Sequence, residues 1–221
     1  MLEVDLVNNI NHYLEMKGIR YSNELRMGIG IPDITINFGA NRRLKPLDDY
    51  FLVSILSYVN DRRMVTFTEI QETFLLGLEK VKQYVSTLVN LSLVIIKNTL
   101  VKIVKNIISI NLGITISIEA KLKDWKGACL QAQRYLCFSD YSYVALPSET
   151  IKNVNLSILQ ESGIGLLSVH GKKIEEILPA KKSISCDYVL KYISTSKVIE
   201  KNLNIEKRHL RPNVFTSHIL T

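Results

Sequence analysis

The stretch Ile114-Thr-Ile-Ser-Ile-Glu-Ala-Lys121 decides the fold that we expect. Its isoleucines alternate with small polar residues, a pattern that is typical of a β-strand. Because side chains alternate between the two faces of a strand, Glu119 and Lys121 point to the same side, while Ala120 packs on the other. The stretch therefore predicts a buried strand that ends in a carboxylate and an ammonium group.

A second acidic residue stands at the start of another Ile-rich strand. The dipeptide Pro32-Asp33 is followed directly by the predicted strand Ile34–Phe38. If this strand pairs with the one that begins at Ile114, Asp33 joins the pair formed by the glutamate and the lysine. Mg²⁺ prefers oxygen ligands and is commonly held by one or two carboxylates, water and phosphate. We therefore expect an Mg²⁺ (or Mn²⁺) site, where the lysine polarises a water or stabilises charge on a phosphate.

Residues 43–109, between these two strands, have a different character. The apolar spacing predicts a helix that starts at Pro46, a second helix over Thr66–Phe74, a third after Gly77, and then a hairpin. This order resembles a winged helix-turn-helix insert, with its third helix as the DNA reader. Such helix triplets also serve protein contacts or dimerisation. The candidate DNA-binding residues lie on the third helix and the hairpin: Lys80, Lys82, Gln83, Lys97 and Lys102.

The remaining elements complete the expected fold class, an α/β protein whose mixed central sheet is flanked by helices. Apolar periodicity predicts helices near residues 2–14, 124–138, 150–160 and 183–201, and strands within residues 19–38, 141–146 and 163–169. We divide the chain into a discontinuous core of residues 1–42 and 110–180, the insert of residues 43–109, and a helical, basic extension of residues 181–221.

The order of these motifs resembles the PD-(D/E)xK nuclease superfamily. The residues that carry the resemblance are, in chain order, Glu24, Pro32, Asp33, Glu119, Lys121, Gln131 and Tyr135. The Gln-x-x-x-Tyr spacing is similar to that of the RecB-like branch. The resemblance covers residues 2–38 and 112–170, and it implies a restriction-endonuclease-like core that the insert interrupts.

The resemblance also implies a role for each of these side chains. Asp33 and Glu119 would bind the metal ion, Lys121 would be the catalytic lysine, and Glu24 would be an auxiliary metal ligand. The glutamine and the tyrosine on the next helix would orient the site or contact nucleic acid. Two of these residues also have simpler interpretations, because Glu24 fits an exposed loop and Tyr135 fits the apolar stripe of its helix.

The amino-acid composition indicates which binding partners and which cellular compartment to expect. Lys and Arg outnumber Asp and Glu by 28 − 21 = 7, and the sequence pI is about 9.2, which favours a polyanionic partner such as DNA. Three cysteines without CxxC spacing exclude a Cys₄ zinc or iron–sulfur site. An odd number of cysteines and the lack of a signal-like start predict a cytoplasmic protein without a membrane partner.

These features together predict a metal-dependent DNA endonuclease that hydrolyses phosphodiester bonds, with the insert aiding DNA binding. Cutting both strands of a duplex takes two active centres, which favours a homodimer. The alternative from another class is a non-catalytic DNA-binding or transcription-regulating protein, in which the insert carries the function. The Lys121→Ala variant distinguishes the two hypotheses. If the chain is a nuclease, this variant should lose cleavage while it still binds DNA.

Overall fold

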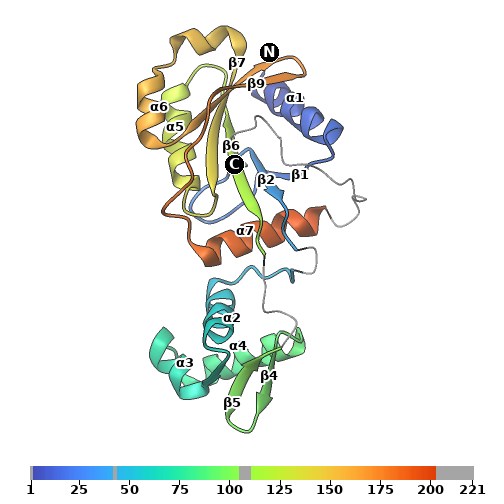
Figure 1. Ribbon diagram of the computed structural model, residues 1–221, viewed down its shortest axis with the longest axis vertical. Coiled ribbons are helices and arrows are strands. Elements are labelled where there is room, and N and C mark those ends of the chain that lie inside the picture. The colour runs from blue at the N-terminus through green and yellow to red at the C-terminus, as the bar shows by residue number, and fades with distance from the viewer. Residues whose placement is uncertain (1, 42–43, 105–110, 203–221) are drawn as a thin grey trace.

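The structure is a computed structural model that describes residues 2–41, 44–104 and 111–202, and helix α7 joins its two unequal parts (Figure 1). The larger part is built on a six-stranded mixed sheet with the order β1-β2-β6-β7-β8-β9. Strands β1, β2 and β6 are antiparallel, β6, β7 and β8 are parallel, and β9 returns antiparallel to β8. The strands are β1 (Arg20–Asn23), β2 (Ile34–Phe38), β6 (Ile114–Ala120), β7 (Tyr141–Pro147), β8 (Gly165–His170) and β9 (Lys173–Leu178).

Helix α1 (Glu3–Met16) covers one face of this sheet. Its residues Leu6, Ile10 and Leu14 recur at helical spacing and are fully buried. They pack on the alternate residues of the central strands that point to this face: Ile34, Ile36, Ile116, Ile118, Ala120, Tyr143, Ala145, Leu167 and Val169. The alternation that predicts a strand in the sequence thus also selects which side chains form this core.

The opposite face of the sheet is divided between an apolar half and a polar half. Helices α5 (Trp125–Tyr135) and α6 (Leu156–Ser162) cover β7 and β8 through small and aliphatic side chains. A 3-10 helix, η2 (Ser148–Asn153), precedes α6. Over β1, β2 and β6 lies α7 (Tyr188–Lys201), where Asn37 donates to the Thr115 and Thr195 hydroxyls over 3.1 and 3.3 Å. The candidate site lies on this second face of the sheet.

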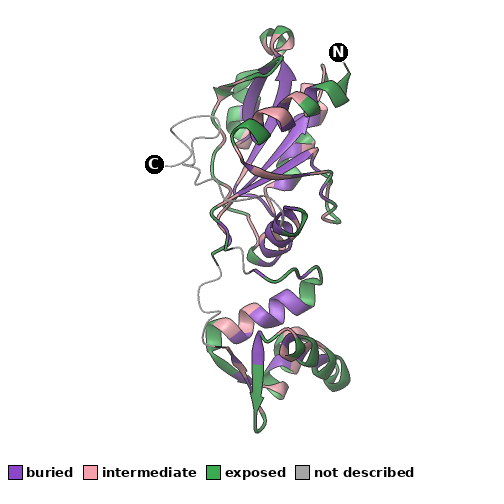
Figure 2. Cartoon of the chain, turned by 90° about the vertical axis from the view of Figure 1, so that its right-hand side faces the viewer, coloured by how far each residue is buried: buried purple, intermediate pink, exposed green. Residues whose placement is uncertain are grey.

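The smaller part, residues 44–104, is called here the α2–β5 block. Its elements are α2 (Tyr50–Arg62), β3 (Met64–Thr66), α3 (Phe67–Phe74), α4 (Leu78–Asn90), β4 (Val94–Lys97) and β5 (Leu100–Ile103). The three short strands form a separate antiparallel sheet with the order β3-β5-β4. Figure 2 shows the buried sides of these elements turned towards each other, with exposed residues around the outside.

Helix α7 packs on both parts of the molecule. Its Tyr192 and Ile193 belong to the apolar cluster of the α2–β5 block, while Ser194 and Thr195 are buried towards the sheet. The Lys191 ammonium lies 2.7 Å from the Asp140 carboxylate beside β7, and Asp140 also accepts a hydrogen bond from the Thr115 N–H. The predicted extension thus contains a helix that is integral to the packing, and residues 203–221 of it lie outside the described residues.

The structure confirms the α/β class and the mixed sheet flanked by helices, and it changes several element boundaries. The helix expected from Pro46 begins at Tyr50, because Asp49 caps it by accepting the Leu52 N–H. The helix expected over residues 150–160 is a 3-10 turn followed by α6. Strands β3 and β9 were not predicted. Within the described ranges, none of the helices is long and apolar enough to cross a membrane.

Candidate active site

The carboxyl end of β6 brings the predicted acidic residues to one level of the sheet. Ile34 pairs with Ile118 across the β2–β6 ladder, so Asp33 lies opposite Glu119 when this register is continued by one residue. Glu24 lies opposite Asp33 on the other side, because Asn23 pairs with Ile34 and the Glu24 N–H donates to the Asp33 carbonyl over 3.2 Å. Three acidic positions therefore stand side by side on neighbouring strands.

Glu119 is the most deeply buried of these acids, with 3% of its surface exposed. One carboxylate oxygen accepts a hydrogen bond from the Tyr135 hydroxyl over 2.7 Å, and the other lies 3.0 Å from the Lys121 ammonium. Burial raises the pKa of Glu119, and the nearby charge of Asp33 adds to this increase, although the two donors oppose it. The pKa is raised overall, so a nearby positive charge would favour the ionised carboxylate.

Asp33 is held by the backbone of the strand that carries Glu119. Its Oδ2 accepts the Ala120 N–H over 2.7 Å, which fixes the aspartate across the end of the ladder. Burial raises the pKa of Asp33. The hydrogen bond from Ala120 and the charge of Lys121 lower this pKa, while the charges of Glu3 and Glu24 raise it. The net effect is a raised pKa. Both carboxylates are thus held in place at some electrostatic cost, which is common at functional sites.

Lys121 lies between two carboxylates and is held as an ammonium group. Its Nζ is 3.0 Å from Glu119 and 3.5 Å from Glu3, the first residue of α1. Burial lowers the pKa of Lys121, but hydrogen bonding to Glu119 and the charges of Glu119, Asp33 and Glu3 outweigh this effect, so the pKa is raised. This lysine can therefore supply positive charge and donate hydrogen bonds at neutral pH, but it is a poor general base.

Glu3 was not predicted from the sequence to be part of the site. It reaches Lys121 because α1 packs across the sheet with its amino end at the strand end that carries the lysine. The only signal in the sequence was an acidic residue in the first turn of an amphipathic helix. Acidic residues are common there, because they favour the positive end of the helix dipole.

The two candidates on α5 lie one helical turn apart and have different environments. Tyr135 is buried, and its hydroxyl donates to Glu119 over 2.7 Å, while the Ile31 carbonyl lies 3.1 Å from the same oxygen. This burial favours a role in orienting Glu119 over a direct contact with nucleic acid. The Oε1 atom of Gln131 is buried and has no hydrogen-bond partner among the described residues. Buried polar atoms are usually paired, so Gln131 is suited to bind a water or a ligand.

Glu24 is exposed, and its backbone φ of 48° is in the left-handed region, which is uncommon for residues other than glycine. No group of three or more Asp, Glu, His or Cys side chains within the described ranges is arranged to hold a metal ion. The role of Glu24 as an auxiliary ligand thus stays a prediction. Two carboxylates are nevertheless enough for Mg²⁺, which takes its other ligands from water and phosphate. The donor set of Asp33 and Glu119 fits this requirement.

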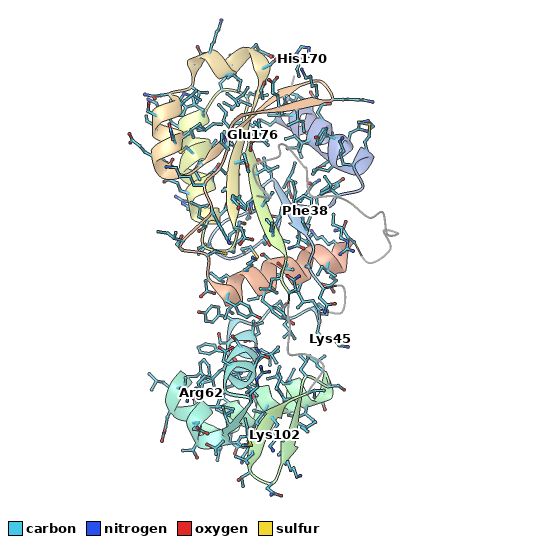
Figure 3. All side chains as sticks on the ribbon, viewed as in Figure 1. Phe38, Lys45, Arg62, Lys102, His170 and Glu176 are labelled. Atoms are coloured by element: carbon cyan, nitrogen blue, oxygen red, sulfur yellow. The ribbon has the colours of Figure 1, made fainter. Side chains whose placement is uncertain are left out.

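The predicted DNA-binding residues lie at the other end of the molecule. Lys80, Lys82 and Gln83 are exposed on α4, where Lys82 pairs with Glu79 over 2.7 Å. Lys97 is exposed at the end of β4, and Lys102 is half-buried in β5. Figure 3 shows Lys102 in the α2–β5 block and His170, which ends the parallel strand β8, at the opposite end. The carboxyl end of β6 points away from the block, so the two sets of residues are not brought together (Figure 1).

Comparisons of the chain with protein-family models, with curated proteins and with solved structures found no match. Any function must therefore be argued from the site itself. The site provides two carboxylates and an ammonium group at one strand end, with a tyrosine that fixes one of the carboxylates.

Proposed function

We propose that the chain is a metal-dependent phosphodiester hydrolase that cuts DNA, with a restriction-endonuclease-like core of the PD-(D/E)xK kind. One observation carries the proposal: Asp33 lies opposite Glu119 when the β2–β6 register is continued by one residue, and the Lys121 ammonium lies 3.0 Å from the Glu119 carboxylate. The order of a helix, an antiparallel strand pair, the Glu-x-Lys strand and a helix with Gln131 and Tyr135 supports it further.

The burial of Glu119 also supports a functional role. A buried carboxylate with a raised pKa is costly, and a hydrophobic residue at this strand position would pack at a lower cost. Structural ion pairs also perturb pKa values, but here two carboxylates approach each other at the end of a strand, where they add repulsion. Such an arrangement is expected where a cation binds.

The residues divide the chemistry of hydrolysis between them. Asp33 and Glu119 would hold a divalent cation, which would supply Lewis-acid chemistry when bound. Lys121, kept as an ammonium group, stabilises the negative charge that grows on the phosphate as water attacks phosphorus and the P–O bond to the leaving oxygen breaks. The proton that the water loses passes to solvent, and the leaving oxygen takes up another. Tyr135 fixes the orientation of Glu119 throughout.

The α2–β5 block supports DNA as the polymer, in the form of a winged-helix module. Its helices α2, α3 and α4, followed by the β4–β5 hairpin, have the order of that motif, and α4 exposes Lys80, Lys82 and Gln83. These residues lie far from the carboxylates along the molecule (Figure 1). A duplex that contacts both must therefore run along the molecule, or a second copy must supply one of the two contacts. The second case corresponds to a homodimer, whose two active centres could cut both strands.

The deciding experiment is cleavage of supercoiled, linear and branched DNA by the purified protein with Mg²⁺, Mn²⁺ or EDTA. The Lys121→Ala variant should cut at least about 100-fold more slowly, because a charge-stabilising donor of this kind contributes on the order of 10²–10³ in rate. Lys123→Ala is the matched control, since Lys123 is exposed two residues further along, and it should cut within about twofold of the wild type.

The results separate the proposed function from its alternative. Cutting that persists in EDTA, or equally in Lys121→Ala, overturns the assignment of the site. Binding of duplex DNA without any cutting moves the non-catalytic DNA-binding protein ahead. Direct titration with Mn²⁺ tests the metal site independently, because Asp33→Asn should weaken Mn²⁺ binding whether or not a DNA substrate has been found.

The winged-helix assignment has its own test, the salt dependence of DNA affinity. Replacing Lys80 and Lys82 with alanine should weaken binding and lower the slope of log K against log salt by up to roughly 2, about 0.9 for each phosphate that is no longer neutralised. The control replaces Lys181 and Lys182, an exposed pair outside the block. Equal slopes in the two variants contradict the role of α4.

A further inference from the structure

The chain between β1 and β2 doubles back in a hairpin-like loop, called here the finger (residues 24–33), whose last residue is the candidate metal ligand Asp33. The β1–β2 ladder ends at Asn23 and Ile34, and two further backbone bonds link the arms of the finger: the Glu24 N–H donates to the Asp33 carbonyl and the Met27 N–H donates to the Gly30 carbonyl, each over 3.2 Å. Gly28 turns the chain at the tip with a φ of 81°, a conformation that glycine adopts without strain. The finger is thus a defined hairpin.

The finger is fastened at several points along its backbone. Lys197 of α7 donates to the Arg26 carbonyl over 3.0 Å, and the Tyr135 hydroxyl of α5 lies 3.1 Å from the Ile31 carbonyl. Gly30 lies so close to the Tyr135 ring that an added Cβ would approach a ring carbon to 2.6 Å. At the base of the finger, Leu25 is buried. These contacts hold the finger in place before any substrate arrives, so little ordering is needed on binding.

Two isoleucines of this finger are turned towards solvent. Ile29 is 44% exposed and Ile31 is 50% exposed, and both are within four residues of Asp33. Single exposed apolar residues are ordinary on protein surfaces. Two of them on one fastened loop, next to a carboxylate site, provide an exposed apolar surface that is held in place. The exposed Arg26 on the same finger offers a positive charge for a phosphate.

The position of the finger indicates what the two isoleucines would meet. Two residues of extended chain cover roughly 7 Å, so Ile31 reaches about that far from Asp33. Base pairs are spaced by about 3.4 Å along a duplex, so a phosphate held at the carboxylates places the bases one or two steps away beside the finger. Isoleucine is one of the apolar side chains that proteins insert between base steps, where it unstacks them.

Resting on the proposed nuclease function, we propose that the finger inserts Ile29 and Ile31 against unstacked bases beside the cut site. The preferred substrate is then DNA that is already distorted, such as a flap, a bulge or a branch. Unstacking a step of intact duplex costs a few kcal/mol, and this cost is lower where the base is mismatched or unpaired. The isoleucines thus select DNA structure, while the carboxylates and Lys121 perform the hydrolysis.

The test compares an intact duplex with a flap and a bulge of the same sequence, each carrying 2-aminopurine beside the junction. The full chain is compared with a variant carrying both Ile29→Ser and Ile31→Ser. The control is Ile184→Ser, a change of the same kind at a fully exposed isoleucine outside the finger, at 105% exposure. Cleavage is followed with Mg²⁺, and 2-aminopurine fluorescence is followed in EDTA, where no cutting occurs.

We expect the wild type and Ile184→Ser to cut the flap and the bulge at least tenfold faster than the duplex, and to raise the fluorescence on binding. The finger variant should lose both effects while binding Mn²⁺ as the wild type does. If it keeps the same preference and the same fluorescence change, the finger proposal is overturned and the nuclease proposal stands. If the wild type cuts none of the substrates, the nuclease proposal fails, and the fluorescence alone tests the finger proposal. A fluorescence rise that only the finger variant lacks supports insertion of the isoleucines. The absence of any rise with the wild type refutes insertion.

Discussion

The ion pair between Lys191 and Asp140 should contribute more to stability than any exposed ion pair among the described residues. It joins α7 to the sheet over 2.7 Å, and the two side chains are only 16% and 9% exposed, respectively. Changing Lys191 to Met keeps most of the length and volume of the side chain but leaves the Asp140 carboxylate without its cation. The perturbation is therefore mainly electrostatic.

The expected size follows from the surroundings of Asp140. Breaking a buried ion pair by removing one partner costs about 3–5 kcal/mol. Asp140 keeps its 2.7 Å hydrogen bond from the Thr115 N–H, and Lys191 retains some contact with water, so we expect the lower end, about 3 kcal/mol. Changing both residues, Lys191→Met with Asp140→Asn, removes the unpaired charge and should recover roughly half of that loss.

Urea unfolding measures this directly, because Trp125 is the one tryptophan of the chain and reports on α5. A loss of about 3 kcal/mol lowers the midpoint by roughly 1–1.5 M for a slope of about 2–3 kcal/mol/M. Lys173→Met is the matched control: its pair with Glu175 spans 3.9 Å with 78% and 62% of the side chains exposed, and it should lose less than about 1 kcal/mol. If both variants shift the midpoint equally, the reasoning is refuted.

Three further predictions follow from local geometry. Gly113→Ala should destabilise the protein by at least about 2 kcal/mol in thermal denaturation, because Gly113 has a φ of 62° and an added Cβ would collide with the Phe38 carbonyl; an unchanged melting temperature contradicts this. Thr66→Ala should cost about 1 kcal/mol at neutral pH by removing the capping box with Glu69. Hydrogen bonds from Thr66 lower the pKa of Glu69, so this difference should shrink as the pH falls through that lowered pKa, and a constant difference would count against the capping box. Burial raises the pKa of Cys186 to about 11, so its alkylation by iodoacetamide, followed by mass spectrometry, should still accelerate about tenfold per pH unit between pH 8 and 10; a plateau by pH 9.5 would show a lower pKa.

The strand pattern of Ile114–Lys121 was enough to predict the centre of the sheet. The alternation of side chains along the strand predicted Glu119 and Lys121 on one side. In the structure the Lys121 ammonium lies 3.0 Å from a Glu119 carboxylate oxygen. The position of Asp33 depended on a pairing across a long insert, which the sequence could suggest only through the similar character of the two strands. The ladder between β2 and β6 confirms that pairing. Local alternation therefore predicts which side chains of one strand share a face. Predicting which strand pairs with it needs a second observation.

Other features of the structure could not be read from local patterns. The contact of Glu3 with Lys121 depends on where α1 crosses the sheet, which its own apolar stripe does not specify. On α7, Thr195 is buried against the polar strand residues Asn37 and Thr115, and Ser194 is buried with its hydroxyl donating to the Phe138 carbonyl, although hydroxyl side chains in a helix usually indicate a solvated face. Tyr135 fits both of its interpretations, because it is buried and its hydroxyl also holds Glu119.

The way the α2–β5 block interrupts the sheet has a consequence for the order in which the chain folds. Neighbouring strands β2 and β6 are separated in sequence by the whole block, and pairing over such a distance is slow, since loop closure precedes the contacts that reward it. Asn41 and Asn111 are joined by a backbone hydrogen bond of 2.9 Å, so a folded block delivers β6 beside β2. During synthesis the block emerges after β2 and before β6, and α7 follows every strand of the sheet. A nascent chain that stops short of α7 therefore exposes the Asn37–Thr115 polar row and one side of α2, and should be a target for chaperones and proteases until that helix is made.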